Sequence, residues 1–258
     1  MNILFKNKKS LGQNFLINEK IQKQICSLTK IENEEVLEVG PGKGYLTKYI
    51  LKQNPSRLIL IEKDYSLHPF LSKVVDKKKQ DVELIFDDIL KIPIFKLSNR
   101  KITILANLPY NIATTLILKW LPHINSIKTM ILMVQKEVAL RLSARHKTKE
   151  YGRISVLAQL LSNIEVKLKV EPENFFPKPK VDSAVLKIIP QKKKQFNYEN
   201  LDKTLKLSFL HRRKTLRNNL KKIDPNIEIK ISKCGIDPNL RPEEITPLEY
   251  IKLSEVLF

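Results

Sequence analysis

Short apolar runs that alternate with longer amphipathic segments are the feature that most constrains the fold of this chain. Each run is rich in branched apolar residues, which is typical of strands covered on both faces. The five runs are Glu35–Val39, Arg57–Glu62, Val82–Phe86, Ile102–Asn107 and Thr129–Val134. Helical spacing marks the segments between them at 46–53, 65–75 and 113–121. This order predicts an α/β fold with a mostly parallel, doubly wound sheet.

Two later apolar runs, Ile164–Val170 and Ser183–Ile189, also resemble strands. They follow a helical stretch that includes 154–161 rather than a further alternation of strand and helix. We expect them to extend the sheet by antiparallel pairing at its edge.

The residue pattern changes at a charged connector, 191–196. Beyond it, only helical patterning is found. The predicted helices are 200–210, 213–222 and 247–257. Thr246 and Glu249 form a capping box at the start of the last one. We therefore expect a sheet domain over residues 1–190 and a small all-α domain over residues 191–258.

The net charge restricts the class of partner. The chain carries 47 Lys and Arg against 27 Asp and Glu, a formal charge of +20, with 42% hydrophobic residues. That apolar content is typical of a globular protein rather than a disordered one. The charge favours a polyanion such as nucleic acid, although an AT-rich genome would also enrich lysine.

The cysteines, histidines and apolar runs give no sign of a metal, disulfide or membrane site. Cys26 and Cys234 lie far apart without metal-ligand spacing, and the four histidines are scattered. No apolar run approaches the roughly 20 residues of a membrane span, and the N-terminal run is too short for a secretory signal. We expect a soluble, cytoplasmic protein without a metal.

A glycine-rich turn, EVGPGKG at 38–44, follows the first predicted strand. Gly40 and Gly42 allow the backbone to turn tightly and let a ligand lie against it. Tyr45 stands where a dinucleotide-binding motif needs its third glycine. This favours S-adenosylmethionine, whose amino-acid end has no phosphates, although a plain strand-to-helix turn fits the same spacing.

Acidic residues end the next two strands. Glu62 ends the second and is suited to accept hydrogen bonds from both hydroxyls of a ribose. Asp87 and Asp88 follow the third strand, and one of them is expected to accept a proton from an adenine amino group. The spacing alone does not choose between them.

The sequence Asn107-Leu108-Pro109-Tyr110 directly follows the fourth strand. The exocyclic amine of adenine is a poor nucleophile because its lone pair is delocalised into the ring. The amide oxygen of Asn107 and the carbonyl of Leu108 can accept its two protons, and Pro109 holds that carbonyl rigidly. Tyr110 is expected to stack on the base. The motif therefore predicts methylation of an aromatic amine.

Six motifs together resemble the ribosomal RNA adenine dimethyltransferases. They are SLGQNFL at 10–16, LEVGPGKG at 37–44, IEKD at 61–64, NLPYNIAT at 107–114, FFPKPKVDSAV at 175–185 and HRRKTLRNNL at 211–220. The similarity is greatest to the bacterial small-subunit branch, which is associated with kasugamycin sensitivity. It implies a Rossmann-like methyltransferase sheet with a helical C-terminal domain. It also implies dimethylation of two adjacent adenosines in a hairpin loop near the 3′ end of small-subunit RNA.

The resemblance also assigns roles to residues. The implied cofactor contacts are Asn14, Leu16, Gly40, Gly42, Glu62, Asp88 and Asn107. Tyr110 and Phe175 become the two aromatic surfaces for an extruded base, with Phe176 as the competing choice for the second. The implied partner is the precursor of the small ribosomal subunit. The protein is expected to act on it as a monomer.

Two groups of basic residues are expected to contact RNA phosphates. Lys178 and Lys180 lie in the FFPKP loop, beside the predicted base site. Arg212, Arg213, Lys214 and Arg217 are expected on one helix of the C-terminal domain.

Three rival functions share parts of these patterns. A large-subunit methylase of the macrolide-resistance type has the same chemistry, but the N-terminal motif and the FFPKPKVDS loop favour the small-subunit branch. A methylase-like transcription or assembly factor could dispense with Asn107 and Tyr110, both of which are present. A nicotinamide dehydrogenase is disfavoured by Tyr45.

Overall fold

The computed structural model describes residues 8, 12–75, 81–191 and 195–258. Ser10 and Leu11 of the N-terminal motif and residues 192–194 of the connector lie outside this part of the chain. The protein divides into two compact units, residues 1–139 with 165–190 and residues 140–164 with 191–258. The first unit ends at residue 190. Residues 140–164 belong to the second unit, which the sequence did not predict.

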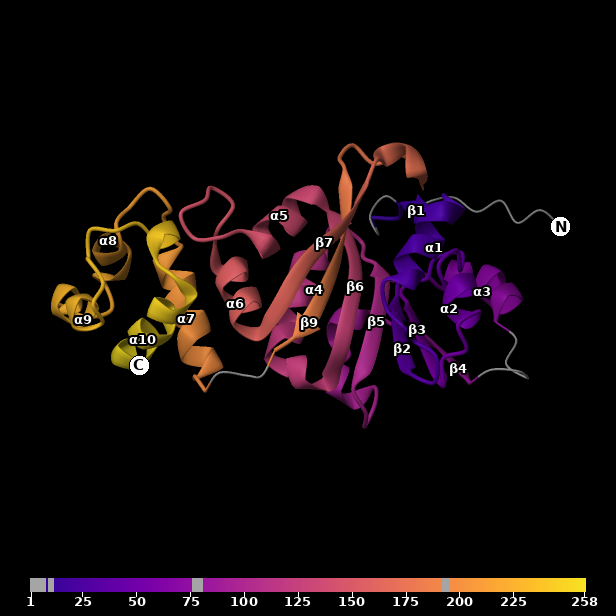
Figure 1. Ribbon diagram of the computed structural model, residues 1–258, viewed down its shortest axis with the longest axis horizontal. Coiled ribbons are helices and arrows are strands. Elements are labelled where there is room, and N and C mark those ends of the chain that lie inside the picture. The colour runs from indigo at the N-terminus through magenta and orange to yellow at the C-terminus, as the bar shows by residue number, and fades with distance from the viewer. Residues whose placement is uncertain (1–7, 9–11, 76–80, 192–194) are drawn as a thin grey trace. The chain divides into compact units, whose positions relative to one another are not determined.

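The first unit is built on a seven-stranded sheet with the order β4-β3-β2-β5-β6-β9-β7 (Figure 1). Its strands are β2 (Glu35–Val39), β3 (Arg57–Glu62), β4 (Val82–Phe86), β5 (Ile102–Asn107), β6 (Ile127–Gln135), β7 (Ser162–Val170) and β9 (Ser183–Pro190). The strands from β4 to β6 pair in parallel, whereas β9 pairs with β6 antiparallel. The predicted fold class and the antiparallel extension are confirmed.

Both faces of the sheet are buried, as expected for a doubly wound fold. Its helices include α1 (Glu19–Ser27), α2 (Thr47–Leu51), α3 (His68–Val74) and α4 (Ala113–Trp120), while α5 (Lys136–Ser143) begins in the first unit and ends in the second. Leu60 and Leu105 share one core cluster with apolar side chains of α1 and α2. Ile59 and Ile104 alternate with them and are also fully buried. Because alternate side chains point to opposite faces, apolar residues fill both sides of these strands.

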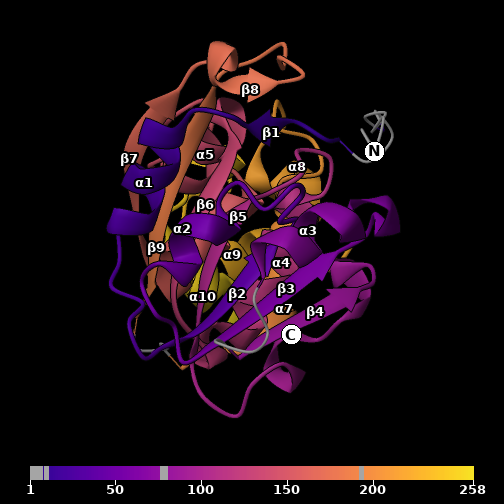
Figure 2. The same cartoon turned by 90° about the vertical axis from the view of Figure 1, so that its right-hand side faces the viewer.

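A two-stranded sheet joins the N-terminal motif to the FFPKP loop (Figure 2). In it β1 (Phe15–Leu16) pairs antiparallel with β8 (Phe175–Phe176), with Leu16 opposite Phe175. The backbone amide of Ile17 extends the pairing by donating to the Asn174 carbonyl at 2.9 Å. Two segments from opposite ends of the first unit are therefore neighbours, which was not predicted from the sequence.

The second unit is helical. Its helices are α6 (Arg153–Leu161), α7 (Tyr198–Ser208), α8 (Leu216–Leu220), α9 (Ile227–Lys233) and α10 (Pro247–Leu257). Residues 195–258 contain no strand. The capping box is confirmed, because Glu249 accepts from the Thr246 amide at 2.8 Å and the Thr246 hydroxyl accepts from the Glu249 amide at 3.3 Å. None of the helices in the described part of the chain has the length and hydrophobicity needed to cross a bilayer.

The predicted helix over 213–222 was wrong at its start. Residues 211–215 form a loop, and α8 begins only at Leu216. The side-chain amide of Asn219 explains the difference, since it donates to the carbonyls of His211 and Lys214 and accepts from the His211 amide. These bonds satisfy loop backbone groups that a helix would have paired within itself.

Candidate active site

One polar side chain from each of five adjacent strands points to the same face of the sheet at its carboxyl edge. We call this set the polar row. Its members are Glu62 of β3, Glu38 of β2, Asn107 of β5, Gln135 of β6 and Ser183 of β9. The carboxyl ends of strands in open α/β sheets are where ligands bind.

The strand register sets the relative height of these residues. Glu38 lies level with the residues two positions before Glu62 and Asn107. Asn107 in turn pairs with Met133, two positions before Gln135. Gln135 pairs directly with Ser183. Residues two apart in a strand share a face, so the polar row rises from buried Glu38 toward the rim of the sheet at Gln135.

The glycine turn beside Glu38 needs glycine for steric reasons. Gly40 and Gly42 adopt φ of 66° and 60°, in the left-handed region that side chains disfavour. A Cβ atom on Gly42 would lie 2.7 Å from a ring carbon of Phe15, which is too close for any real contact. The Phe15 ring of the N-terminal segment therefore packs directly on this turn.

Glu62 holds the glycine turn and the following loop together. Its carboxylate accepts from the Gly42 amide at 3.1 Å and from the Asp64 amide at 2.8 Å, one to each oxygen. Burial raises the pKa of Glu62, although these amide hydrogen bonds oppose the shift. A carboxylate has about four lone-pair positions, so Glu62 keeps capacity for a hydroxyl donor.

Glu38 is the most buried acid of the polar row, at 2% exposure. The Thr47 hydroxyl donates to it at 2.7 Å, from the first turn of α2. Burial raises the pKa of Glu38 to about 8. The side chain is therefore mostly protonated at neutral pH, and it lines the same cavity as the glycine turn.

Asp64 holds the N-terminal segment. It accepts from the Lys8 ammonium at 2.6 Å and from the Gln13 amide at 2.7 Å. Burial acts to raise the pKa of Asp64, but hydrogen bonds from Lys8, Ser66 and Gln13 lower it to about 2. The ionised carboxylate ties this segment to the end of β3.

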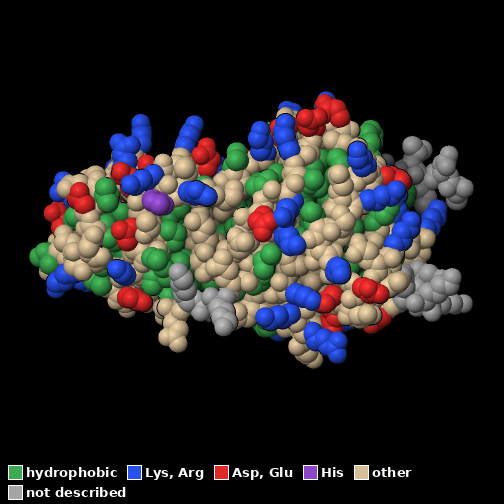
Figure 3. Space-filling view, viewed as in Figure 1, with side chains coloured by type: hydrophobic (Ala, Val, Ile, Leu, Met, Phe, Trp, Pro, Cys, Tyr) green, Lys and Arg blue, Asp and Glu red, His purple; other side chains and the backbone are tan. Residues whose placement is uncertain are grey.

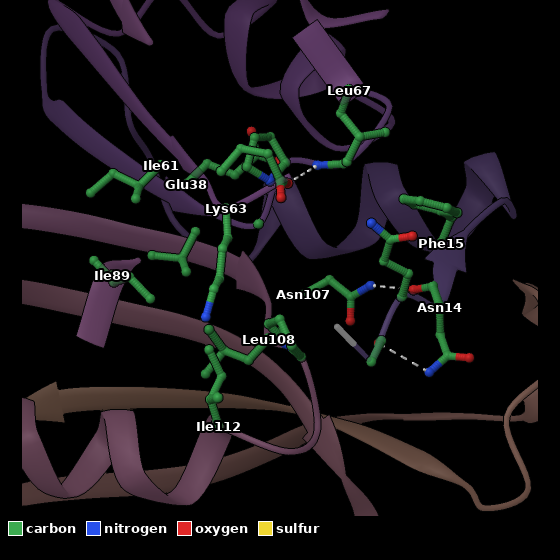
Figure 4. A pocket seen from close by; sticks show the side chains of 18 of the residues that line it. Asn14, Phe15, Glu38, Ile61, Lys63, Leu67, Ile89, Asn107, Leu108 and Ile112 are labelled. Carbon is green, nitrogen blue, oxygen red and sulfur yellow. Dashed lines mark hydrogen bonds between the residues drawn. The ribbon is translucent and has the colours of Figure 1, made fainter. Parts of the chain in front are cut away.

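Asn14 connects the same segment to Asn107. The Asn107 side-chain NH₂ donates to the Asn14 backbone carbonyl at 3.0 Å (Figure 4). Since one end of the Asn107 amide is engaged in this way, its oxygen is the end left to meet a ligand.

The loop after β5 is positioned by contacts on three sides. The Leu108 amide donates to the Met133 carbonyl at 3.1 Å, while within the described residues no group donates to the Leu108 carbonyl. Pro109 packs near Gly40, where an added Cβ would lie 3.7 Å from its Cδ. The Tyr110 hydroxyl is hydrogen-bonded to the Ser183 hydroxyl, and burial raises the pKa of Tyr110. The hydrogen bond to Ser183 thus holds the Tyr110 ring in position.

Ten of the predicted site residues line one cavity. They are Asn14, Leu16, Gly40, Gly42, Glu62, Asp88, Asn107, Leu108, Pro109 and Tyr110. Asp87 lines it as well. The Lys63 ammonium lies 2.8 Å from Asp88, and this hydrogen bond lowers the pKa of Asp88. The assignment of Asp88 over Asp87 stays a prediction.

A second cavity shares Asn14 and Tyr110 with the first. Gln135, Lys178 and Lys180 also line it. Neither lining includes Phe175.

Phe175 and Phe176 differ sharply in burial. Phe175 is 3% exposed in the core cluster, whereas Phe176 is 61% exposed. The role of Phe175 as a base-stacking surface stays a prediction.

The predicted arginine patch lies in the second unit, but not on one helix. That prediction was wrong, because Arg212, Arg213 and Lys214 belong to the loop before α8 and only Arg217 is helical. Arg212 donates to the Tyr151 carbonyl at 3.0 Å, and Arg217 pairs with Glu228 at 3.1 Å. These two arginines already hold structural partners, so Arg213 and Lys214 are the better candidates for phosphate contacts.

Several residues of the site were not predicted from the sequence. Gln13, Lys63 and Asp64 lie within the quoted motifs, but their contacts join segments distant in the chain, so the motifs gave them no individual role. Gln135 and Ser183 were not predicted either, because only the register between strands places them on the face of Asn107. In the described part of the chain no cluster of His, Cys, Asp and Glu is arranged to hold a metal.

The fold, the glycine turn and the polar row around the first cavity are those of a Rossmann-like methyltransferase. The chain belongs to the ribosomal RNA adenine dimethylase family, whose model matches residues 4–257. The protein is therefore an enzyme of the class that dimethylates adenine in ribosomal RNA.

Curated relatives match along nearly the whole chain. A "Ribosomal RNA small subunit methyltransferase A" of Pelagibacter ubique is 41% identical, covering 96% of this chain and 95% of the relative. The protein of that name from Wolbachia pipientis wMel is also 41% identical, covering 97% and 89%.

Solved structures agree with the fold. A dimethyladenosine transferase from Plasmodium falciparum superimposes with a TM-score of 0.77 at 25% identity, covering 93% of this chain and 95% of that one. The 23S rRNA methyltransferase ErmE shares the fold, with a TM-score of 0.68 at 23% identity and coverage of 94% and 99%.

The burial of Glu38 predicts a pH-dependent stability. Between about pH 4.5 and 8 the unfolded chain ionises this residue while the folded protein keeps the proton. Unfolding then releases a proton, so rising pH lowers the free energy of unfolding. We expect Glu38→Gln to remove this component, so that its Tm, measured without ligand, rises relative to the parent as pH increases from 5 to 8.

Glu32→Gln, an exposed position, serves as the control and should follow the parent curve. Parallel Tm curves for Glu38→Gln and the parent would contradict the prediction.

Proposed function

We propose that this enzyme transfers two methyl groups in succession from S-adenosylmethionine to the N6 amine of each of two adjacent adenosines in small-subunit ribosomal RNA. The names of the curated relatives support the small subunit as substrate. The hairpin loop near the 3′ end remains part of this proposal, as do action on a subunit precursor, a cytoplasmic location and a monomeric state.

The residues around the first cavity fit S-adenosylmethionine. Gly42 leaves no room for a Cβ, and the Glu62 carboxylate keeps capacity to accept from a ribose hydroxyl. Asn14, Leu16 and Asp88 complete the proposed contacts. When bound, the cofactor supplies a methyl carbon made electrophilic by its sulfonium.

The orientation of the Asn107 amide carries the proposal. Its NH₂ group is engaged by the Asn14 carbonyl at 3.0 Å, so its oxygen can accept one proton of the target amine. The Leu108 carbonyl can accept the other, because no described residue donates to it. Two acceptors pull the amine toward tetrahedral geometry and localise its lone pair, which raises its nucleophilicity.

Tyr110 holds the base in line with the methyl group. Its hydroxyl is tied to Ser183, so the ring presents a fixed face for stacking. Held in this way, the amine nitrogen would accept the methyl group from the sulfonium of the bound cofactor, and the extra proton on nitrogen would leave to water. No strong general base is needed, since the sulfonium is already an activated leaving group. A second transfer requires that this pocket admit a monomethylated amine.

Methylation of isolated subunits tests the proposed substrate. We expect incorporation of methyl groups into small subunits from cells that lack this modification, with N6,N6-dimethyladenosine detected by mass spectrometry. Incorporation into large subunits alone would instead assign the macrolide-resistance type of activity.

The acceptor role of Asn107 predicts a selective loss of turnover. Asn107→Ala removes one of two groups that activate the amine, and we expect kcat to fall by about 100-fold. Cofactor affinity, measured by calorimetry, should change far less. Asn99→Ala, at an exposed position, is the control; a turnover in Asn107→Ala equal to that control would refute the role.

The exposed basic residues of the second unit predict a change in salt dependence. Lysine and arginine side chains are spread over the face drawn in Figure 3, among acidic ones. Arg213→Glu with Lys214→Glu is expected to weaken RNA binding and to reduce the slope of log K against log salt by about 0.7 for each phosphate that is no longer neutralised. Lys20→Glu with Lys101→Glu provides the same charge change elsewhere. Identical slopes for the two double variants would exclude a specific contact at 213 and 214.

A further inference from the structure

Gln135 ends β6 at the rim of the polar row. It lies on the face of the sheet that carries Asn107, two residues farther along the strand direction. Two strand residues span about 6.6 Å. The side chain of Gln135 therefore stands roughly one base width beyond the residue proposed to hold the target amine.

The strand pairing brings Gln135 next to the stacking ring. Ser183 is its direct cross-strand partner, and the Ser183 hydroxyl bonds to Tyr110. Cβ atoms of paired residues are about 5 Å apart. Gln135 also lines the second cavity together with Tyr110 and Lys178.

The amide of Gln135 has hydrogen-bonding capacity that the protein does not use. The side chain is only partly exposed, and within the described residues no hydrogen bond to its amide is formed. A glutamine amide offers two donors and one carbonyl acceptor. Beside an aromatic surface in a cavity, such a group is suited to recognise a polar edge of a planar ligand.

We propose that Gln135 is a specificity residue that reads the target adenine by donating a hydrogen bond to a ring nitrogen beside the reacting amine. This inference rests on the proposed function and deepens it. In adenine the amine is flanked by N1 and N7, both of which are acceptors. Guanine carries a proton on N1 and an oxygen in place of the amine, so the same amide donor favours adenine when it faces N1.

Modified RNA hairpins test the proposal directly. The substrates carry adenosine, 1-deazaadenosine or 7-deazaadenosine at the target position, and each deaza base lacks one of the two candidate acceptors. Gln135→Met keeps the length of the side chain but removes the donor. With adenosine we expect its kcat/KM to fall about 10- to 100-fold.

The sharp expectation is non-additivity. On the deaza substrate that lacks the contacted nitrogen, the parent enzyme and Gln135→Met should react at equal rates, since the hydrogen bond is already absent. On the other deaza substrate, kcat/KM of Gln135→Met should remain lower than that of the parent by the same factor as on adenosine. The substrate that abolishes the difference identifies N1 or N7 as the acceptor.

Two measurements separate recognition from structure. The Tm and the calorimetric affinity for S-adenosylmethionine should be the same in Gln135→Met and the parent. Gln24→Met, on the exposed side of α1, controls for a Gln-to-Met change elsewhere and should leave all rates unchanged.

Each failure has a distinct meaning. Equal deficits of Gln135→Met on all three substrates would overturn the reading role while leaving the proposed function intact. An adenosine deficit equal to that of Gln24→Met would do the same. Absence of methylation of the adenosine hairpin by the parent enzyme would overturn the proposed function and this inference together.

Discussion

The hydrogen bond from the Asn107 amide to the Asn14 carbonyl is the interaction on which the site depends. The engaged NH₂ group leaves the oxygen as the end of the Asn107 amide that is available to a ligand. The hydrogen bond also brings the N-terminal segment into the lining of the cavity beside Asn107. That segment is held independently by Asp64 and by pairing of β1 with β8, so the orientation of Asn107 is supported from both sides.

The polar row shows how a sheet with an apolar core places polar side chains at one edge. Leu60 and Leu105 fill the same face of their strands as Glu62 and Asn107, one pleat step below. The change from apolar to polar occurs where the strands leave the core and water or ligand can reach them. Only Glu38 lies deeper, and its burial is tolerated because it accepts from Thr47 and keeps its proton at neutral pH.

Much of the fold was predictable because each signal was local. Branched apolar runs marked the strands, and the Thr246 capping box marked the start of α10. The helix predicted to begin at residue 213 failed for the opposite reason, since Asn219 ties up the preceding loop through bonds that no helical pattern encodes. The pairing of β1 with β8 was equally invisible, because two-residue strands carry no periodic signal.

The family, the strands of the sheet and the Asn-Leu-Pro-Tyr motif were all recognisable from the sequence, since each is marked by residues close together in the chain. Tertiary structure decided which polar groups are already engaged and which remain available. Arg212 and Arg217 proved to have internal partners, while the Leu108 carbonyl and the Gln135 amide have none among the described residues. Composition cannot report this difference, because a hydrogen bond between distant segments depends on the register and packing that bring them together.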